Sequence, residues 1–287
     1  MVRLSDGRRL AYAEWGEPEG RCVFLLHGTS HSRLFCPDEA VTVSSGVRLV
    51  TVDRPGVGGS DVLPRRTFGD WPADLLQLAD ALGADTFGVV GWSAGGVYAA
   101  ACAALIPARL TGIGIACTRH LSDSNIAENP SAFEELDGAD QEMFKPAQRD
   151  PDAAASATVD QEREWVEAIW KKPESALDRY ATPAGDRWFF EDEELRRPFF
   201  EATRESVRQG PEAYVWELID AWLPWAFALR RSRPKSSWRG AQDPIVDRRH
   251  IDFTVQLLPN ARLTVWDDAG HFGPPRHWGE ILEAVTN

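Results

Sequence analysis

The chain has 287 residues, of which 43% are hydrophobic and 26% are charged, so it carries enough apolar side chain for one large core. This composition excludes an intrinsically disordered protein and suits one α/β domain with an insertion. The formal net charge of −13 would repel a nucleic-acid backbone, so nucleic acid is not an expected partner. No run approaches the roughly 18 apolar residues of a membrane helix, and charged residues stand where a signal peptide would be apolar. We therefore expect a soluble, cytoplasmic protein with no membrane partner.

Strand and helix patterns alternate over the first 118 residues. Strand patterns lie at residues 9–15, 22–26, 47–52, 87–90 and 110–117, and helical patterns lie at 70–82 and 97–105. The run at 22–26 is continuously apolar and the run at 47–52 is largely apolar, which is typical of parallel strands buried on both faces. This alternation predicts a doubly wound, mostly parallel sheet with helices on both faces.

The middle of the chain has a different character. Residues 121–232 contain 25 of the 44 acidic and 13 of the 31 basic side chains, a net charge of −12. The same residues hold six of the twelve tryptophans, namely Trp165, Trp170, Trp188, Trp216, Trp222 and Trp225. Their pattern is helical until a strand begins near Trp238, followed by a strand at 262–266 and a helix around 281–285. An acidic, tryptophan-rich helical segment inside a nearly neutral frame predicts a lid or cap.

The strongest chemical motif is Gly-Trp-Ser-Ala-Gly-Gly at residues 91–96, between a predicted strand and a predicted helix. A serine in such a tight strand-to-helix turn sits on a strained backbone with its hydroxyl turned outward. Small neighbours are needed because the strand and helix approach closely, and the helix N-terminus favours developing negative charge. This context predicts that Ser93 is a nucleophile.

A nucleophilic serine needs a base, and the base needs a carboxylate that orients it. Of the six histidines, His271 stands out because it lies in a loop after the last strand with glycines on both sides. Asp243 is the expected acid, directly after the strand at 234–239. That strand is unusually polar, and Asp247 is therefore kept as the alternative acid. The order Ser93, Asp243, His271 is the one expected for a nucleophile elbow on an α/β sheet.

The loop after the first buried strand, residues 27–30, predicts an oxyanion hole. The backbone N–H of Thr29 and that of Ala94, which follows the nucleophile, would bind the developing negative charge. We interpret His27 as a residue that fixes this loop by hydrogen bonding, not as the base. The glycine-rich residues 53–60 lack a Gly-Lys-Ser/Thr sequence, so they are interpreted as a structural turn instead of a phosphate-binding loop.

The four cysteines, Cys22, Cys36, Cys102 and Cys117, show no paired spacing. Without a Cys-x-x-Cys sequence or clustered histidines, a zinc site is not expected, and we interpret the cysteines as buried free thiols. No motif implies another cofactor. We therefore expect neither a metal nor a cofactor.

Together these motifs resemble those of the α/β-hydrolase superfamily, in its branch of capped esterases, lipases and epoxide-hydrolase-like enzymes. The resemblance rests on His27-Gly28, Asp53-x-Pro55-Gly56-x-Gly58-x-Ser60, Gly91-x-Ser93-x-Gly95-Gly96, Gly240-x-x-Asp243 and Gly270-His271. It implies an α/β core at residues 1–118 and 233–287. It also implies a helical cap at 119–232, inserted after the sixth core strand.

By this resemblance Ser93 is the nucleophile, Asp243 the acid and His271 the base. Relatives that open epoxides or displace halide carry aspartate at the elbow, so Ser93 favours acyl transfer through an acyl-enzyme. We expect a hydrolase of a small, neutral, hydrophobic carboxylic ester or lactone. Two alternatives stay open: a hydrolase of a carbon–carbon bond in a diketone-like substrate, and a protein that uses the pocket for binding or biosynthesis without hydrolysis. The oligomeric state is left open.

Four residues are candidates for substrate contact: His31, Trp92, Trp188 and Trp222. His31 lies where loops of this kind often continue with proline and glycine. We interpret it as a solvent-facing loop histidine, with substrate contact as the alternative. Tryptophans of the cap either fasten its helices to the core or line its underside, since ligand pockets are rich in aromatic groups.

Overall fold

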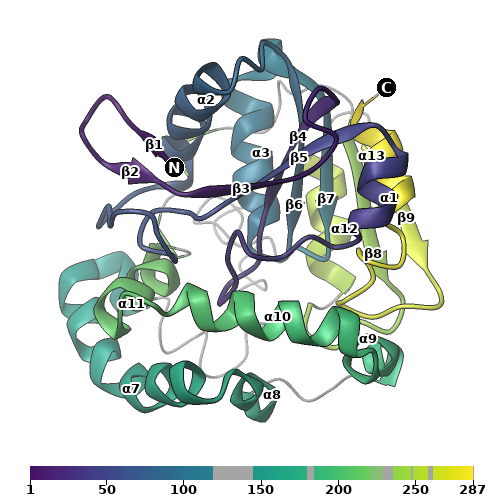
Figure 1. Ribbon diagram of the computed structural model, residues 1–287. Coiled ribbons are helices and arrows are strands. Elements are labelled where there is room, and N and C mark those ends of the chain that lie inside the picture. Colours follow the sequence, from purple (N-terminus) through teal and green to yellow (C-terminus); the bar gives the residue numbers. More distant parts are fainter. Residues whose placement is uncertain are drawn as a thin grey trace.

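A computed structural model of the chain is shown in Figure 1. The structure describes residues 1–118, 145–179, 184–220, 222–223, 225, 227, 235–246, 248–257 and 261–286. The expected cap boundaries at 119 and 232–233, and the alternative acid Asp247, lie outside these residues. Across the part of the chain that is described, no helix combines the length and apolar character needed to cross a membrane.

One mixed sheet lies at the centre of the molecule. Its strands are β3 (Tyr12–Gly16), β4 (Arg21–Leu26), β5 (Val47–Val52), β6 (Phe87–Trp92), β7 (Leu110–Ala116), β8 (Lys235–Gly240) and β9 (Arg262–Trp266). The seven strands are ordered β3-β5-β4-β6-β7-β8-β9, and only β3 is antiparallel to its neighbour. A separate hairpin pairs β1 (Val2–Arg3) with β2 (Arg9–Leu10), so the strand expected at 9–15 is divided between two sheets.

Side chains of the strands alternate between two hydrophobic cores. The helices that accompany the sheet are α1 (Glu39–Ser44), α2 (Trp71–Ala81), α3 (Gly95–Leu105), α12 (Arg248–Leu257) and α13 (Trp278–Thr286). In β4, Phe24 and Leu26 pack with α2 and α3, whereas Val23 and Leu25 pack on the opposite face with α13. Figure 1 shows α2 and α3 on one face of the sheet and α1 and α13 on the other. Burial on both faces explains the apolar runs and confirms the doubly wound architecture.

Between β7 and β8 the chain forms a helical insertion. Its described helices are α7 (Pro151–Lys171), α8 (Ala176–Arg179), α9 (Arg187–Glu191), α10 (Glu193–Ser206) and α11 (Pro211–Asp220). Short 3₁₀ helices are η1 (Phe68–Asp70) and η2 (Pro107–Arg109) in the core, and η3 (Pro173–Ser175) and η4 (Ala184–Asp186) in the insertion. Asp150 and Asp192 begin α7 and α10 by accepting a backbone N–H from the first turn. Because β7 is the fifth strand of the sheet in chain order, the insertion comes one strand earlier than expected.

The insertion lies at one end of the strands (Figure 1). The ion pairs that join it to the core there include Arg33 with Glu205 at 2.8 Å, and Arg54 with Glu217. Arg33 and Arg54 lie in the segments that follow β4 and β5. The insertion therefore covers the carboxyl ends of the strands, the end at which open α/β sheets bind their ligands.

Candidate active site

Ser93 lies in the turn between β6 and α3, as the sequence predicts. Its φ of +54° is in the left-handed region, which a serine adopts only where the surrounding structure holds it. Glycine is required on both sides: a Cβ on Gly95 would come within 1.9 Å of the Leu26 carbonyl oxygen, and one on Gly91 within 2.3 Å of the Gly95 carbonyl oxygen. This is the geometry of a nucleophile elbow.

Hydrogen bonds to the end of β7 hold this elbow. The Ser93 N–H donates to the Ala116 carbonyl oxygen at 2.9 Å, and the Thr118 hydroxyl donates to the Ser93 carbonyl oxygen at 2.9 Å. The Gly96 N–H donates to the same Ser93 oxygen at 2.9 Å, so α3 starts directly after the serine. These contacts stabilise the strained backbone that presents the hydroxyl.

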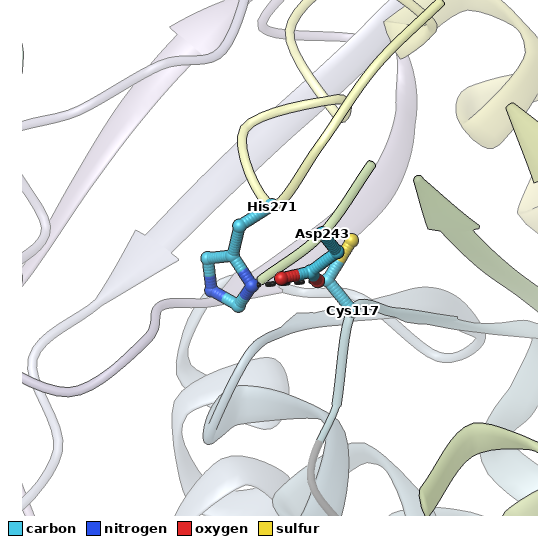
Figure 2. A group of neighbouring side chains, drawn as sticks. All are labelled: Cys117, Asp243 and His271. Atoms are coloured by element: carbon cyan, nitrogen blue, oxygen red, sulfur yellow. Dashed lines mark hydrogen bonds and ion pairs between the residues drawn. The ribbon is translucent and has the colours of Figure 1, made fainter. Parts of the chain in front are cut away.

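His271 and Asp243 form a buried pair (Figure 2). The His271 Nδ1 lies 2.9 Å from the Asp243 Oδ2, and the other oxygen of Asp243 accepts the N–H groups of Ile245 at 2.9 Å and Val246 at 3.0 Å. Asp243 follows β8 and His271 follows β9, so both residues belong to loops at the same edge as Ser93. The structure thus brings the predicted acid and the predicted base together.

The surroundings of Asp243 decide which nitrogen of His271 carries a proton. Burial acts to raise the pKa of Asp243, but the charge and hydrogen bond of His271, with the two backbone N–H groups, lower it below its ordinary value. An ionised carboxylate only accepts hydrogen bonds, so Nδ1 of His271 is the donor in this pair. The Nε2 atom of the neutral ring is then free to accept a proton, as a general base must.

Trp92 joins the base loop to the elbow. Its indole N–H donates to the His271 carbonyl oxygen at 3.0 Å, and the two ring centroids are 6.5 Å apart. Because Trp92 directly precedes Ser93, this bond sets the base loop beside the nucleophile. Trp92 is only 5% exposed, so its packed side chain forms part of the wall of the site.

The predicted oxyanion loop lies against the nucleophile. A Cβ on Gly28 would be 3.1 Å from the Ser93 Cβ and 3.6 Å from its Oγ. Thr29 directly follows Gly28 and Ala94 directly follows Ser93, so the two backbone N–H groups predicted to bind the oxyanion belong to segments in close contact. His27 is hydrogen-bonded through Nδ1 to the Gly28 carbonyl oxygen at 2.8 Å, which fits its predicted role in fixing the loop.

Arg54 is a residue of this site that the sequence analysis missed. It lies in the turn at 53–60, its side chain is fully buried, and it donates to the carbonyl oxygens of His27 and Gly28. The same guanidinium pairs with Glu217 of α11. The turn is structural, as predicted, but its arginine also ties the oxyanion loop to the helical insertion.

A second buried arginine extends this cluster. The Arg66 guanidinium donates to the Tyr98 hydroxyl at 3.0 Å, and its Nε lies 3.2 Å from an Asp220 carboxylate oxygen. Burial raises the pKa of Asp220 to about 8, although the charge of Arg66 acts to lower it. This carboxyl therefore holds a proton in the folded chain over a range in which it is ionised in the unfolded chain.

Asp220→Asn is expected to change how stability depends on pH. The contribution of Asp220 to the free energy of unfolding is fully present below a pH of about 4, where both states hold the proton. It decreases as pH rises from there and is lost once pH has passed the folded-state pKa of about 8. The asparagine variant lacks this titration. The difference between its free energy of unfolding and that of the wild type should therefore shift in favour of the variant by on the order of 4 kcal/mol between about pH 5 and about pH 8. Urea unfolding at both pH values measures this gain. Asp160→Asn on the exposed face of α7 is the control, and an equal difference at both pH values for Asp220→Asn would contradict the prediction.

His31 is buried, so the interpretation of this residue as solvent-facing is wrong. Its ring packs against those of Phe35 and Phe199, with centroid distances of 5.0 Å and 4.8 Å. Burial, followed by the charge of Arg54, lowers the pKa of His31 to about 3, so the imidazole is neutral. Phe199 belongs to α10, and the insertion is therefore what covers this histidine.

The two predicted tryptophans of the insertion occupy different places. Trp188 is half-buried beside the base loop, with the Arg276 guanidinium 4.1 Å from its ring centroid. Trp222 is buried in a cluster of the insertion itself, with Val215 and Ile219 among its members. The structure thus brings Trp188 towards the site and places Trp222 in the packing between α7 and α11.

The side chains of Cys117, Asp243 and His271 gather closely enough to be considered as metal ligands, with donor atoms within 4.8 Å of one another (Figure 2). Two of them already bind each other, and burial, followed by the charge of Asp243, raises the pKa of the Cys117 thiol well above its ordinary value. A protonated thiol is a poor metal ligand. The donor set therefore fits an acid–base pair with a neutral thiol beside it. All four cysteines are free, with Cys102 and Cys117 buried and Cys22 and Cys36 half-buried.

Asp186 is a second residue at this site that the sequence pattern did not reveal. It comes from η4 of the insertion, and its Oδ1 accepts the backbone N–H groups of Gly270 at 2.9 Å and Phe272 at 3.1 Å. These residues flank His271. An aspartate before a helical pattern predicts only a helix cap, so nothing local pointed to this contact.

The similarities of the chain agree with this geometry. A sequence profile of the alpha/beta hydrolase fold family matches residues 22–275. A proline iminopeptidase of Xylella fastidiosa (strain 9a5c) is 33% identical over 121 residues, which make up 39% of this chain and 36% of that protein. The chain thus matches about a third of the length of this relative.

Solved structures that are similar over nearly their whole length include the following two. A thermophilic esterase from Thermogutta terrifontis has a TM-score of 0.67 and 21% identity, covering 98% of this chain and 93% of that one. The enol-lactonase from Burkholderia xenovorans LB400 has a TM-score of 0.64 and 18% identity, covering 98% and 96%. At such identities the similarity shows a common fold alone.

Proposed function

Because the chain belongs to the alpha/beta hydrolase fold family, we propose that it is a serine hydrolase that cleaves a neutral, hydrophobic carboxylic ester or lactone. One observation carries the proposal: Ser93 sits on a left-handed elbow beside a loop whose histidine is paired with a buried carboxylate. Two structural neighbours, an esterase and an enol-lactonase, support the substrate class.

The proposed reaction uses the three residues in the usual division of roles. The Ser93 Oγ attacks the carbonyl carbon while its proton passes to Nε2 of His271, and Asp243 stabilises the imidazolium through Nδ1. The N–H groups of Thr29 and Ala94 bind the oxyanion. Collapse of the tetrahedral intermediate expels the alcohol, which takes the proton from His271. Water, deprotonated by His271, then hydrolyses the acyl-enzyme and regenerates Ser93.

The division into a core at 1–118 and 233–287 and a cap at 119–232 is part of this proposal. Support comes from the contacts of the insertion with the loops of the site: Glu217 with Arg54, and Asp186 with the base loop. A cover over the elbow excludes water and lines the substrate pocket.

A fluorophosphonate probe tests the proposal directly. It should form a stable adduct on Ser93, located by mass spectrometry of the peptide, because it reacts with an activated serine without needing the natural acyl group. Saturable hydrolysis of p-nitrophenyl esters or lactones, with trace turnover of a diketone, supports the ester class, and the reverse supports carbon–carbon hydrolysis. A prolyl anilide is included because one relative is named a proline iminopeptidase. A chain that stays unmodified by the probe would indicate a binding or biosynthetic protein.

A preference for neutral, aromatic or cyclic esters is expected. Aromatic rings surround the base loop: Phe272 lies 5.0 Å from Phe189 and 4.8 Å from Phe190, centroid to centroid. The net charge of −12 on residues 121–232 repels anions over a distance that salt screens to about 8–10 Å. A neutral aryl ester should therefore exceed its carboxylated analogue in kcat/KM by about 10-fold at low salt, with a smaller ratio at high salt.

The measurement compares kcat/KM for the neutral aryl ester, its carboxylated analogue and an acetate ester at two salt concentrations. The acetate is the control for size, since it is neutral but fills little of an aromatic pocket. Equal values for the three substrates, unchanged by salt, would show that neither the aromatic rings nor the acidic surface selects the substrate.

A further inference from the structure

Asp186 occupies the N-cap position of a helix, but its side chain does not cap that helix. It ends η4 and is the N-cap residue of α9, where an aspartate ordinarily accepts a hydrogen bond from its own helix. Its side chain makes no capping bond to any described residue of α9. The carboxylate instead reaches across to the loop that carries His271, and it is fully buried there.

One oxygen atom of Asp186 fixes the backbone on both sides of the base. The N–H groups of Gly270 and Phe272 both point to Oδ1, and the carbonyl oxygen of His271 between them accepts the indole N–H of Trp92 at 3.0 Å. The close approach depends on glycine, because a Cβ on Gly270 would lie 2.4 Å from Oδ2 of Asp186. The direction of the imidazole is therefore set from the core and from the insertion together.

The two hydrogen bonds to the loop backbone do not explain why residue 186 is an aspartate and not a neutral acceptor. The second oxygen of Asp186, Oδ2, is buried and has no hydrogen-bond partner among the described residues. An asparagine would accept the same two N–H groups at a smaller desolvation penalty. Burial raises the pKa of Asp186, while those N–H groups and then the charge of His271 act to lower it. A carboxylate is the better choice where a positive charge forms beside it, as it does when His271 takes a proton.

We propose that Asp186 is a positioning residue for the base: it orients His271 through the two flanking amides, and its negative charge stabilises the imidazolium formed during attack by Ser93. This inference rests on the proposed function, because it requires His271 to be the base. It also means that the base is correctly held only when the insertion is packed against its loop.

Other charged groups near His271 do not duplicate this role. Asp243, from the loop after β8, holds Nδ1 and sets the tautomer. The Cys117 thiol at the end of β7 is neutral, because burial raises its pKa well above the ordinary value, and the Arg239 charge acts on that thiol in the opposite direction. Among the described residues, Asp186 and Asp243 are thus carboxylates that favour the imidazolium from different elements.

The test follows the rate at which a fluorophosphonate probe modifies Ser93 as a function of pH. Asp186→Asn keeps the hydrogen-bond acceptor and removes the charge. We expect the rate at neutral pH to fall by about 10- to 100-fold. The acidic limb of the profile should move to lower pH by about half a unit to one unit, since the imidazolium loses a nearby negative charge. The probe needs no knowledge of the natural substrate.

Asp192→Asn is the matched control. Asp192 belongs to the same insertion and is exposed, and the substitution changes the net charge equally, but this aspartate caps α10 and does not touch the base loop. Its acidic limb should coincide with that of the wild type. Asp186→Ser, a smaller neutral acceptor, replaces Asp186→Asn if the latter does not give a cooperative thermal transition.

The outcomes separate the inference from the function on which it rests. A folded Asp186→Asn with an unmoved acidic limb, whatever its rate, would mean that Asp186 serves packing alone and would overturn the inference while leaving Ser93 and His271 in place. A wild-type chain that the probe does not modify at any pH would overturn the proposed function and, with it, this role for Asp186.

Discussion

Ser93→Ala is expected to lower kcat for ester hydrolysis by at least about 10⁴-fold, to the rate that substrate binding and the oxyanion hole sustain alone. The variant should keep its fold, because alanine retains the Cβ and adds no strain at the φ of +54° that the wild-type serine already adopts. A thermal midpoint within about 2 °C of the wild type is expected. Steady-state kinetics at high enzyme concentration and a melting curve measure both quantities.

The control for this prediction is Ser44→Ala, an exposed serine in the last turn of α1. It removes the same hydroxyl far from the elbow, so its kcat should equal that of the wild type. If the purified Ser93→Ala variant retained most of the wild-type rate, Ser93 would have no place in the mechanism.

The positions of Ser93, Asp243 and His271 could be predicted from the sequence because each of these residues has a local pattern. Ser93 is marked by the glycines that its turn requires, and the structure gives the reason in the 1.9 Å approach of a Cβ on Gly95 to Leu26. Asp243 and His271 follow strands directly, and parallel strands bring their carboxyl ends to one edge. The roles of these residues remain predictions, but their proximity follows from topology.

The same reasoning explains which elements of the fold have a clear sequence pattern and which do not. The long apolar runs of β4, β5 and β6 predict strands because both faces are buried. Helix α1 has six residues, too few for a helical period to stand out. Strand β8 is polar yet lies inside the sheet, between β7 and β9, where the indole of Trp238 stacks on Trp266 at 6.3 Å and donates to Glu280 at 2.7 Å. Trp266 and Glu280 lie far from Trp238 in the sequence, so no local pattern reveals these contacts.

Contacts between the insertion and the core could not be predicted from local patterns. His31 is covered by Phe199, which comes from α10, so a loop histidine that looked exposed is buried. Arg54 belongs to a glycine-rich turn, but its guanidinium forms an ion pair with Glu217 of α11. Both cases have one cause: an inserted helical segment folds back onto loops that precede it by more than a hundred residues. Burial of polar residues is then decided by tertiary contacts, which local periodicity does not report.

Asp243→Asn is expected to lower kcat by about 10³- to 10⁴-fold with little effect on KM. The amide cannot stabilise the imidazolium, and its NH₂ group facing Nδ1 favours the wrong tautomer of His271, with the proton on the nitrogen that must accept one from Ser93. Asp243 also accepts the N–H groups of Ile245 and Val246 through Oδ1, and asparagine can keep both bonds. The loss should therefore appear in the rate of chemistry and not in the amount of folded protein. The pH profile of kcat and circular dichroism separate these two effects.

Two further substitutions show whether Asp243 is the acid. Asp268→Asn makes the same chemical change in the loop of His271 itself, but Asp268 is exposed and contacts His277 at 2.9 Å, so kcat should stay within about threefold of the wild type. Asp247→Asn examines the alternative acid and should be equally mild. A severe loss in Asp247→Asn together with a mild one in Asp243→Asn would transfer the acid to Asp247. The 2.9 Å contact between Asp243 and Nδ1 of His271 argues for the opposite result, because an acid in a triad acts through a hydrogen bond to that nitrogen.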